Sequence, residues 1–147
     1  MAGVFTDLDP GAQMGQMPST AVMLDRGEQR IRSERSDQPE VRARLLDTVG
    51  NAYRNLGRFS EARPLLEEAL ELAPDFAMAR YRLAFLKSET GRVEEALEDI
   101  RHVVSQSSRL PDREARYVRA GEAYLAKRNE EAEAAYREIL DRYPYEI

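Results

Sequence analysis

Few side chains in this sequence could carry out acid–base or metal chemistry. His102 is the only histidine and cysteine is absent, so thiolate metal sites and disulfides are excluded. Two carboxylate pairs, Glu94–Glu95 and Glu130–Glu131, could in principle act as acid and base. Each pair stands at the expected start of a helix, where carboxylates interact favourably with the helix dipole. We therefore expect no enzymatic activity, no metal and no cofactor, and we place His102 on the surface.

An arginine-rich stretch near the N-terminus could at first sight bind nucleic acid. It contains Arg26, Arg30, Arg32 and Arg35, interleaved with Asp25, Glu28, Glu34 and Asp37. This interleaving has ion-pair spacing and predicts a solvated helix face. The formal net charge of -5 also argues against a phosphate backbone as the partner, so we expect no nucleic acid.

The sequence gives no sign of a membrane segment. Eighteen consecutive apolar residues occur nowhere, and the first ten residues, MAGVFTDLDP, lack the basic and apolar regions of a signal peptide. We therefore expect no membrane insertion and a cytoplasmic location.

Apolar residues recur at helical spacing in a unit that runs from Ala43 to Phe76 and repeats along the chain. Its first half ends at Gly57 and its second half ends at Pro74. Apolar or small residues at an offset of thirty-four repeat the pattern: Leu83, Ala84, Gly91, Val93, Ala96, Ile100 and Val103. A pair of amphipathic helices that recurs in this way predicts a stack of helix pairs.

The third unit is irregular between its two helices. Ala132 follows Ala96 at an offset of thirty-six, but Gly121 matches Gly50 only if one residue is missing between the helices. Because Lys127-Arg128-Asn129 lacks the glycine of the other two turns, we predict a one-residue deletion at this turn.

The predicted fold is all-α: an α-solenoid of antiparallel helix pairs in a right-handed superhelix. It comprises a flexible leader at residues 1–18 and a helical repeat domain at 19–147. Within the domain we expect a capping helix at 19–36, repeat one at 39–74, repeat two at 75–108 and repeat three at 111–144. Expected helix N-caps are Ser19 or Thr20, Asp37, Ser60 and Asp75.

These positions resemble the tetratricopeptide repeat over residues 39–144. Repeat one carries the pattern at Leu46, Val49, Gly50, Tyr53, Ala62, Leu66, Ala69 and Pro74. Repeat two keeps Leu83, Ala84, Gly91, Ala96 and Ile100, and repeat three keeps Tyr117, Gly121, Tyr124, Ala132, Tyr136 and Pro144. Repeat two departs from the pattern at Arg80, Lys87 and Ser108.

A narrower resemblance concerns the stretches 23–70 and 110–144. They are similar to the repeat regions downstream of the kinase domain in bacterial serine/threonine protein kinases and related regulators. The chain has no Gly-rich phosphate loop and no HRD or DFG triplet, so kinase activity does not follow.

The resemblance implies that the first helices of the pairs line a concave groove that binds a protein or peptide. The residues expected to contact a peptide are Arg44, Asn51, Arg54, Met78, Tyr81, Phe85 and Glu122. Aromatic residues beside arginine are the usual composition of a binding hot spot. The alternative for Tyr81 and Phe85 is packing against the flanking helix. Because Asp47 stands where a carboxylate-clamp repeat has lysine before its asparagine, we do not expect a chaperone C-terminus as ligand.

A second function is open: self-association, or a regulatory module of a larger bacterial signalling protein such as a kinase. The last helix has surplus apolar residues at Ala135, Leu140, Tyr145 and Ile147, where a further repeat would dock. A solenoid normally ends with a polar outer face, so this end predicts a homodimer through the C-terminal helix.

Overall fold

The computed structural model describes residues 19–33 and 37–144. The predicted leader, the predicted end of the capping helix at 34–36, and Tyr145 and Ile147 lie outside the described residues. The described residues contain seven α-helices, one 3₁₀ turn and no strand. They are α2 (Thr20–Ser33), α3 (Pro39–Asn55), α4 (Phe59–Leu72), α5 (Ala77–Glu89), α6 (Val93–Ser105), η1 (Ser107–Arg109), α7 (Asp112–Leu125) and α8 (Asn129–Arg142).

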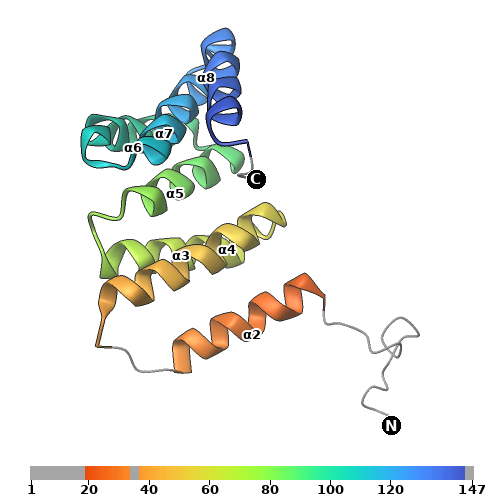
Figure 1. The fold of residues 1–147 in the computed structure, drawn as a ribbon. Helices are drawn as coiled ribbons and strands as arrows, with labels where there is room; N and C mark the ends of the chain where they lie inside the picture. Colours follow the sequence, from red (N-terminus) through yellow and green to blue (C-terminus); the bar gives the residue numbers. More distant parts are fainter. Residues whose placement is uncertain (1–18, 34–36, 145–147) are drawn as a thin grey trace.

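The helices stack in chain order, from α2 at one end of the molecule to α8 at the other (Figure 1). Three antiparallel pairs, α3 with α4, α5 with α6 and α7 with α8, follow the single helix α2, which packs on α3. The predicted all-α solenoid of helix pairs is thus confirmed.

Each pair is joined by the same tight turn, which stops the first helix in a left-handed residue. Gly57 and Gly91 have φ angles of 78° and 89°, and Lys127 has a φ of 65°. The following N–H groups, of Arg58, Arg92 and Arg128, bond back to the carbonyls of Tyr53, Lys87 and Ala123 at 2.9, 2.8 and 2.9 Å. These bonds satisfy carbonyls that the helix end leaves free, as in a Schellman motif.

The predicted deletion in the third unit is wrong. Helices α3, α5 and α7 end at Asn55, Glu89 and Leu125, and the left-handed residue follows two positions later in all three. Lys127 therefore occupies the place of the missing glycine, and no residue is lost. The register of α7 shifts by one position relative to the predicted one. The two additional residues lie before α7, in the connection that contains η1.

One of the predicted N-caps forms a capping hydrogen bond. The Ser19 hydroxyl accepts a bond from the N–H of Val22 at 3.2 Å. The N-cap positions of α3, α4 and α5 are instead Gln38, Arg58 and Phe76, and none makes a side-chain cap bond. The predicted caps Asp37 and Asp75 each lie one residue from the observed N-cap position, and Ser60 lies two residues from it.

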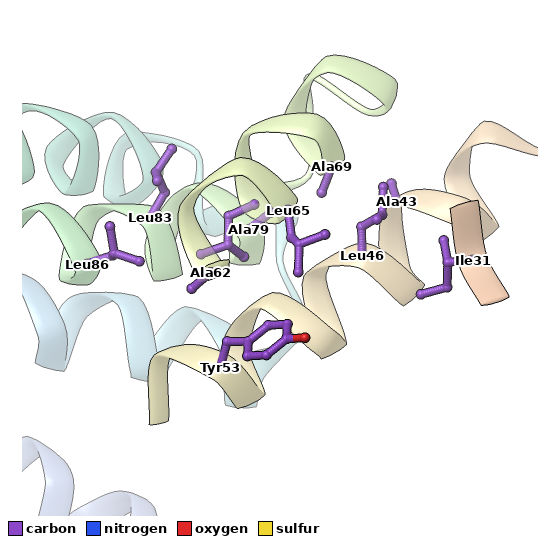
Figure 2. Packing of buried hydrophobic residues seen from close by; sticks show 11 residues of the cluster. Ile31, Ala43, Leu46, Tyr53, Ala62, Leu65, Ala69, Ala79, Leu83 and Leu86 are labelled. Carbon is purple, nitrogen blue, oxygen red and sulfur yellow. The ribbon is translucent and has the colours of Figure 1, made fainter. Parts of the chain in front are cut away.

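The largest core lies around the α3–α4 pair, between α2 and α5 (Figure 2). Tyr53, Leu46, Leu65 and Leu66 are its largest fully buried side chains. A β-carbon added at Gly50 would lie 3.1 Å from Leu66, so the absence of a side chain lets the two helices approach closely.

A second, smaller core lies around the α5–α6 pair. It contains Ala84, Ala96, Ile100 and, from α7, Leu125. The alanines that the repeat pattern places at the closest helix approach, Ala62, Ala96 and Ala132, are all buried.

Candidate functional site

Two adjacent open hollows lie along the first helices of the three pairs, and we call them together the groove. One hollow, of about 560 Å³, is lined by Arg44, Asp47, Thr48, Asp75, Phe76, Ala77, Met78, Arg82, Leu110 and Glu114. The other, of about 420 Å³, is lined by Asn51, Arg54, Met78, Tyr81, Arg82, Arg113, Glu114 and Tyr117. Met78, Arg82 and Glu114 line both hollows, so the hollows are adjacent and together extend over α3, α5 and α7.

The groove contains five of the seven residues expected to contact a peptide. They are Arg44, Asn51, Arg54, Met78 and Tyr81. Phe85 lines a neighbouring pocket described below. Glu122 is not brought together with the others: its carboxylate lies 3.3 Å from Arg128 and 3.9 Å from Arg101 of α6. Its assignment to the groove depended on the predicted deletion.

The same register error hid the contribution of α7 to the groove. Ala115, Val118 and Leu125 would occupy groove positions if the predicted deletion were real, and all three are buried. Glu114 and Tyr117, one position earlier in the helix, line the groove instead. Counting the third unit without a deletion would have found both residues.

Arg82, which the sequence did not single out, is held in the groove by a buried carboxylate of the preceding repeat. Its guanidinium forms an ion pair with Asp47, which is 5% exposed. Burial raises the pKa of Asp47, whereas Arg82 lowers it and the charge of Glu114 raises it further. Asp47 Oδ1 has no hydrogen-bond partner among the described residues, which leaves the carboxylate incompletely satisfied.

A second ion pair joins the same two helices further along the groove. Arg54 Nη1 lies 2.6 Å from Glu89 Oε1 of α5. Arg54 also donates to Asn51 Oδ1 from Nε and Nη2, at 3.3 and 3.2 Å. Because the Asn51 oxygen is engaged, its amide nitrogen remains the group that can donate to a bound segment.

Three aromatic side chains form a pocket next to the groove, which we call the aromatic pocket. The pocket has a volume of about 520 Å³. It is lined by Phe85, Ser88 and Glu89 of α5, Tyr124 of α7 and Tyr136 of α8. The rings of Phe85 and Tyr124 are nearly parallel, with centroids 6.0 Å apart. Tyr124 is 54% exposed, which is unusual for so large an apolar side chain.

Tyr81 and Phe85 pack against the flanking helix, as the alternative interpretation of the sequence held. Their rings meet edge to face at 5.0 Å. A β-carbon added at Gly121 of α7 would lie 2.6 Å from the Tyr81 ring and 2.8 Å from the Phe85 ring. Burial, followed by the charge and hydrogen bond of Tyr136, raises the pKa of Tyr81.

The described residues contain no cluster of three metal-ligating side chains. No described helix is long and apolar enough to cross a bilayer. His102 is exposed on α6, away from the groove-lining residues.

Comparison with one solved structure supports the fold. The MamA RS-1 ArsTM double mutant is 24% identical and superposes with a TM-score of 0.54, covering 86% of this chain and 67% of that chain. MamA 41-end from Desulfovibrio magneticus RS-1 is 22% identical, with a TM-score of 0.45, over 88% of this chain and 79% of that chain.

Sequence comparison gives the repeat type. Protein O-mannosyl-transferase TMTC3 of Homo sapiens is 32% identical over 104 residues, and the match spans 62% of this chain but 11% of that protein. Residues 53–107 and residues 86–147 each match the tetratricopeptide repeat family. The two matches together cover residues 53–147, and the chain therefore contains tetratricopeptide repeats.

Proposed function

We propose that this chain is a binding scaffold whose groove holds a segment of a partner protein. The observation that carries the proposal is the pair of adjacent hollows over α3, α5 and α7. An open hollow shared by three parallel helices accommodates an extended or helical segment better than a small molecule, which favours enclosed pockets.

The ion pairs of the groove support the same proposal. Asp47–Arg82 and Arg54–Glu89 each join one repeat to the next, so they fix the spacing of the groove wall before a partner arrives. A preorganised wall loses less conformational freedom on binding, which favours affinity.

The test begins with the unmodified chain on an array of random twelve-residue peptides, and the strongest binder is then titrated by calorimetry. We expect Asn51→Ala and Met78→Ala each to weaken binding by about 1 kcal/mol or more. Glu94→Ala and Arg101→Ala on α6 line neither hollow and serve as controls. Equal affinity of groove and control variants would contradict the proposal, as would an array without binders.

The second proposal, self-association, rests on the last helix. Leu140 of α8 is 58% exposed, the largest exposure among the large apolar side chains of the described residues. The same helix carries the ion pair Glu133–Arg137 on its exposed surface, so the exposed apolar area of α8 is small. This proposal comprises a homodimer through α8. It further holds that the chain is a regulatory part of a larger bacterial signalling protein and that it is located in the cytoplasm.

Sedimentation velocity over a range of concentrations tests the homodimer. Leu140→Glu should abolish any concentration-dependent dimer, whereas Arg137→Glu, on the same helix, should leave it largely intact. A wild-type chain that remains monomeric at millimolar concentration rejects self-association.

A further inference from the structure

We infer that the aromatic pocket binds a cationic side chain, lysine or arginine, of the partner segment. The inference rests on the proposed groove function and names the chemistry of the partner. It assigns a role to Tyr124, Tyr136 and Glu89.

The lining of the pocket is what an organic cation requires. Phe85, Tyr124 and Tyr136 come from three different helices and surround one hollow. Aromatic rings attract cations through the negative charge of their faces, and three rings around one site are the arrangement used for ammonium groups.

The rings are also held in place. The Phe85 ring packs edge to face against Tyr81 and lies nearly parallel to the ring of Tyr124. A pocket whose walls are already ordered needs little rearrangement to receive a side chain.

A carboxylate stands at the edge of the aromatic pocket. Glu89 lines it, and Arg54 engages Glu89 Oε1. No hydrogen bond or ion pair to Oε2 is found among the described residues, so this oxygen can accept a bond from a ligand ammonium or guanidinium.

The charged residues that line the neighbouring groove are nearly balanced. Asp47, Asp75 and Glu114 lie beside Arg44, Arg54, Arg82 and Arg113. The groove itself therefore does not select the sign of the ligand, which is set by the rings and by Glu89. The formal net charge of -5 favours the approach of a basic segment.

Two small probes of the same shape test the inference without any peptide: choline, and its uncharged isostere 3,3-dimethyl-1-butanol. Their binding is followed through the NMR signals of the tyrosine rings, with sodium chloride balancing the ionic strength. We expect choline to shift the signals of Tyr124 and Tyr136 saturably, and to bind at least about threefold more tightly than the isostere.

Variants locate the site. Tyr124→Leu keeps an apolar side chain at a half-exposed position and should abolish the preference for choline, whereas Tyr124→Phe should retain it. Glu89→Gln should weaken choline binding about twofold or more. Glu94→Gln removes the same charge outside the pocket and should have no effect. Circular dichroism confirms that each variant is folded.

Three results would overturn the inference. Equal or tighter binding of the uncharged isostere would show that the pocket takes an apolar side chain. Shifts that persist in folded Tyr124→Leu would place the probe elsewhere, and no saturable shift in the wild type would remove the site. Because neither probe is a peptide, these results are independent of whether the groove binds a partner.

Discussion

Gly121 lies where two helices would collide if it carried a side chain. A β-carbon there would meet the rings of Tyr81 and Phe85 at 2.6 and 2.8 Å, closer than carbon atoms normally approach. We expect Gly121→Ala to destabilise the chain by about 1–3 kcal/mol through overpacking, measured by urea unfolding. The near-ultraviolet circular dichroism of the tyrosines should change as well.

The control for this prediction is Gly27→Ala in α2. There the nearest heavy atom, Val49 Cγ2, would lie at an ordinary 3.9 Å. Alanine should therefore stabilise the helix by roughly 0.5–1 kcal/mol. Similar effects of the two substitutions would show that contact with the Tyr81 and Phe85 rings is not what requires glycine at position 121.

The sequence could identify Gly121 as structurally important but not its contact. The repeat pattern equates it with Gly50, which lies against its own pair partner through Leu66. Gly121 instead faces the preceding first helix, because its register is one position different. For the same reason Glu114, Tyr117 and Tyr124 were not among the residues predicted to bind a peptide. Arg82 was not predicted as a groove residue, because its partner Asp47 lies in another repeat and the local spacing of residues does not reveal such a contact.

The turn between the two helices of a pair determines the register of α7 relative to the repeat pattern. Lys127 adopts the left-handed conformation that glycine adopts at the other two turns, although a β-carbon makes it costly by about 1 kcal/mol. The bond from Arg128 N–H to the Ala123 carbonyl and the packing of the helix pair outweigh that cost. The absence of glycine therefore did not indicate the absence of the turn.

We expect Lys127→Gly to stabilise the chain by about 0.5 kcal/mol, since relief of strain exceeds the added flexibility of the unfolded chain. Thermal unfolding measures the effect. Lys127→Ala, which loses the charge but keeps the β-carbon, should lack this gain. If both variants gain equally, the lysine charge and not the conformation is responsible.

The last helix pair is closed by a polar clasp around Asp112 at the start of α7. Asp112 Oδ2 accepts a hydrogen bond from the Tyr143 hydroxyl at 2.7 Å and lies 2.9 Å from Arg116 and 3.2 Å from Arg142. The bond from Tyr143, followed by that from Arg116, lowers the pKa of Asp112. A carboxyl with a lowered pKa in the fold contributes stability above its unfolded pKa and loses it as the pH falls through the folded value.

Asp112→Asn should therefore lower the melting temperature at neutral pH. The difference from the wild type should shrink as the pH falls below about 4, where the wild-type carboxyl takes up its proton. Asp141→Asn on α8 removes the same charge outside the clasp and is the control. A difference that is constant with pH, or equal in the control, would exclude the clasp as its origin.

On the scale of the whole molecule, the burial of side chains is uneven along the stack. The fully buried Tyr53, Leu46 and Leu65 belong to the core around α3 and α4, whereas the core around α5 and α6 is smaller and includes only Leu125 from α7. Contacts between pairs are local in a solenoid, so neighbouring pairs can open separately.

We expect native-state hydrogen exchange to be slowest for backbone amides of α3 and α4 and faster for those of α7 and α8. Leu46→Ala should raise exchange in α3 and α4 far more than in α8. Uniform protection of all helices would mean that the stack opens as a single unit.

The number of helices in the described residues, their order and the solenoid could be predicted from the sequence. These features depend on apolar periodicity and on the glycines and prolines between helices, which are local signals. The register of the third pair was mispredicted, because its turn lacks the glycine that marks the other two turns and the two additional residues lie in the connection before α7.

The clasp at Asp112 also bears on how the chain responds to mechanical load. A pull on the chain beyond Pro144 acts first on Tyr143 and Arg142, both of which are held to the start of α7. A pull on the chain ahead of α2 acts on a helix that is tied to the stack through Asp25, which accepts a hydrogen bond from the Tyr53 hydroxyl and pairs with Arg58. Because α2 packs on α3 alone and buries only Ile31, whereas α8 buries Ala132 and Ile139 and is also held by the clasp, a tethered chain should peel from α2 before α8.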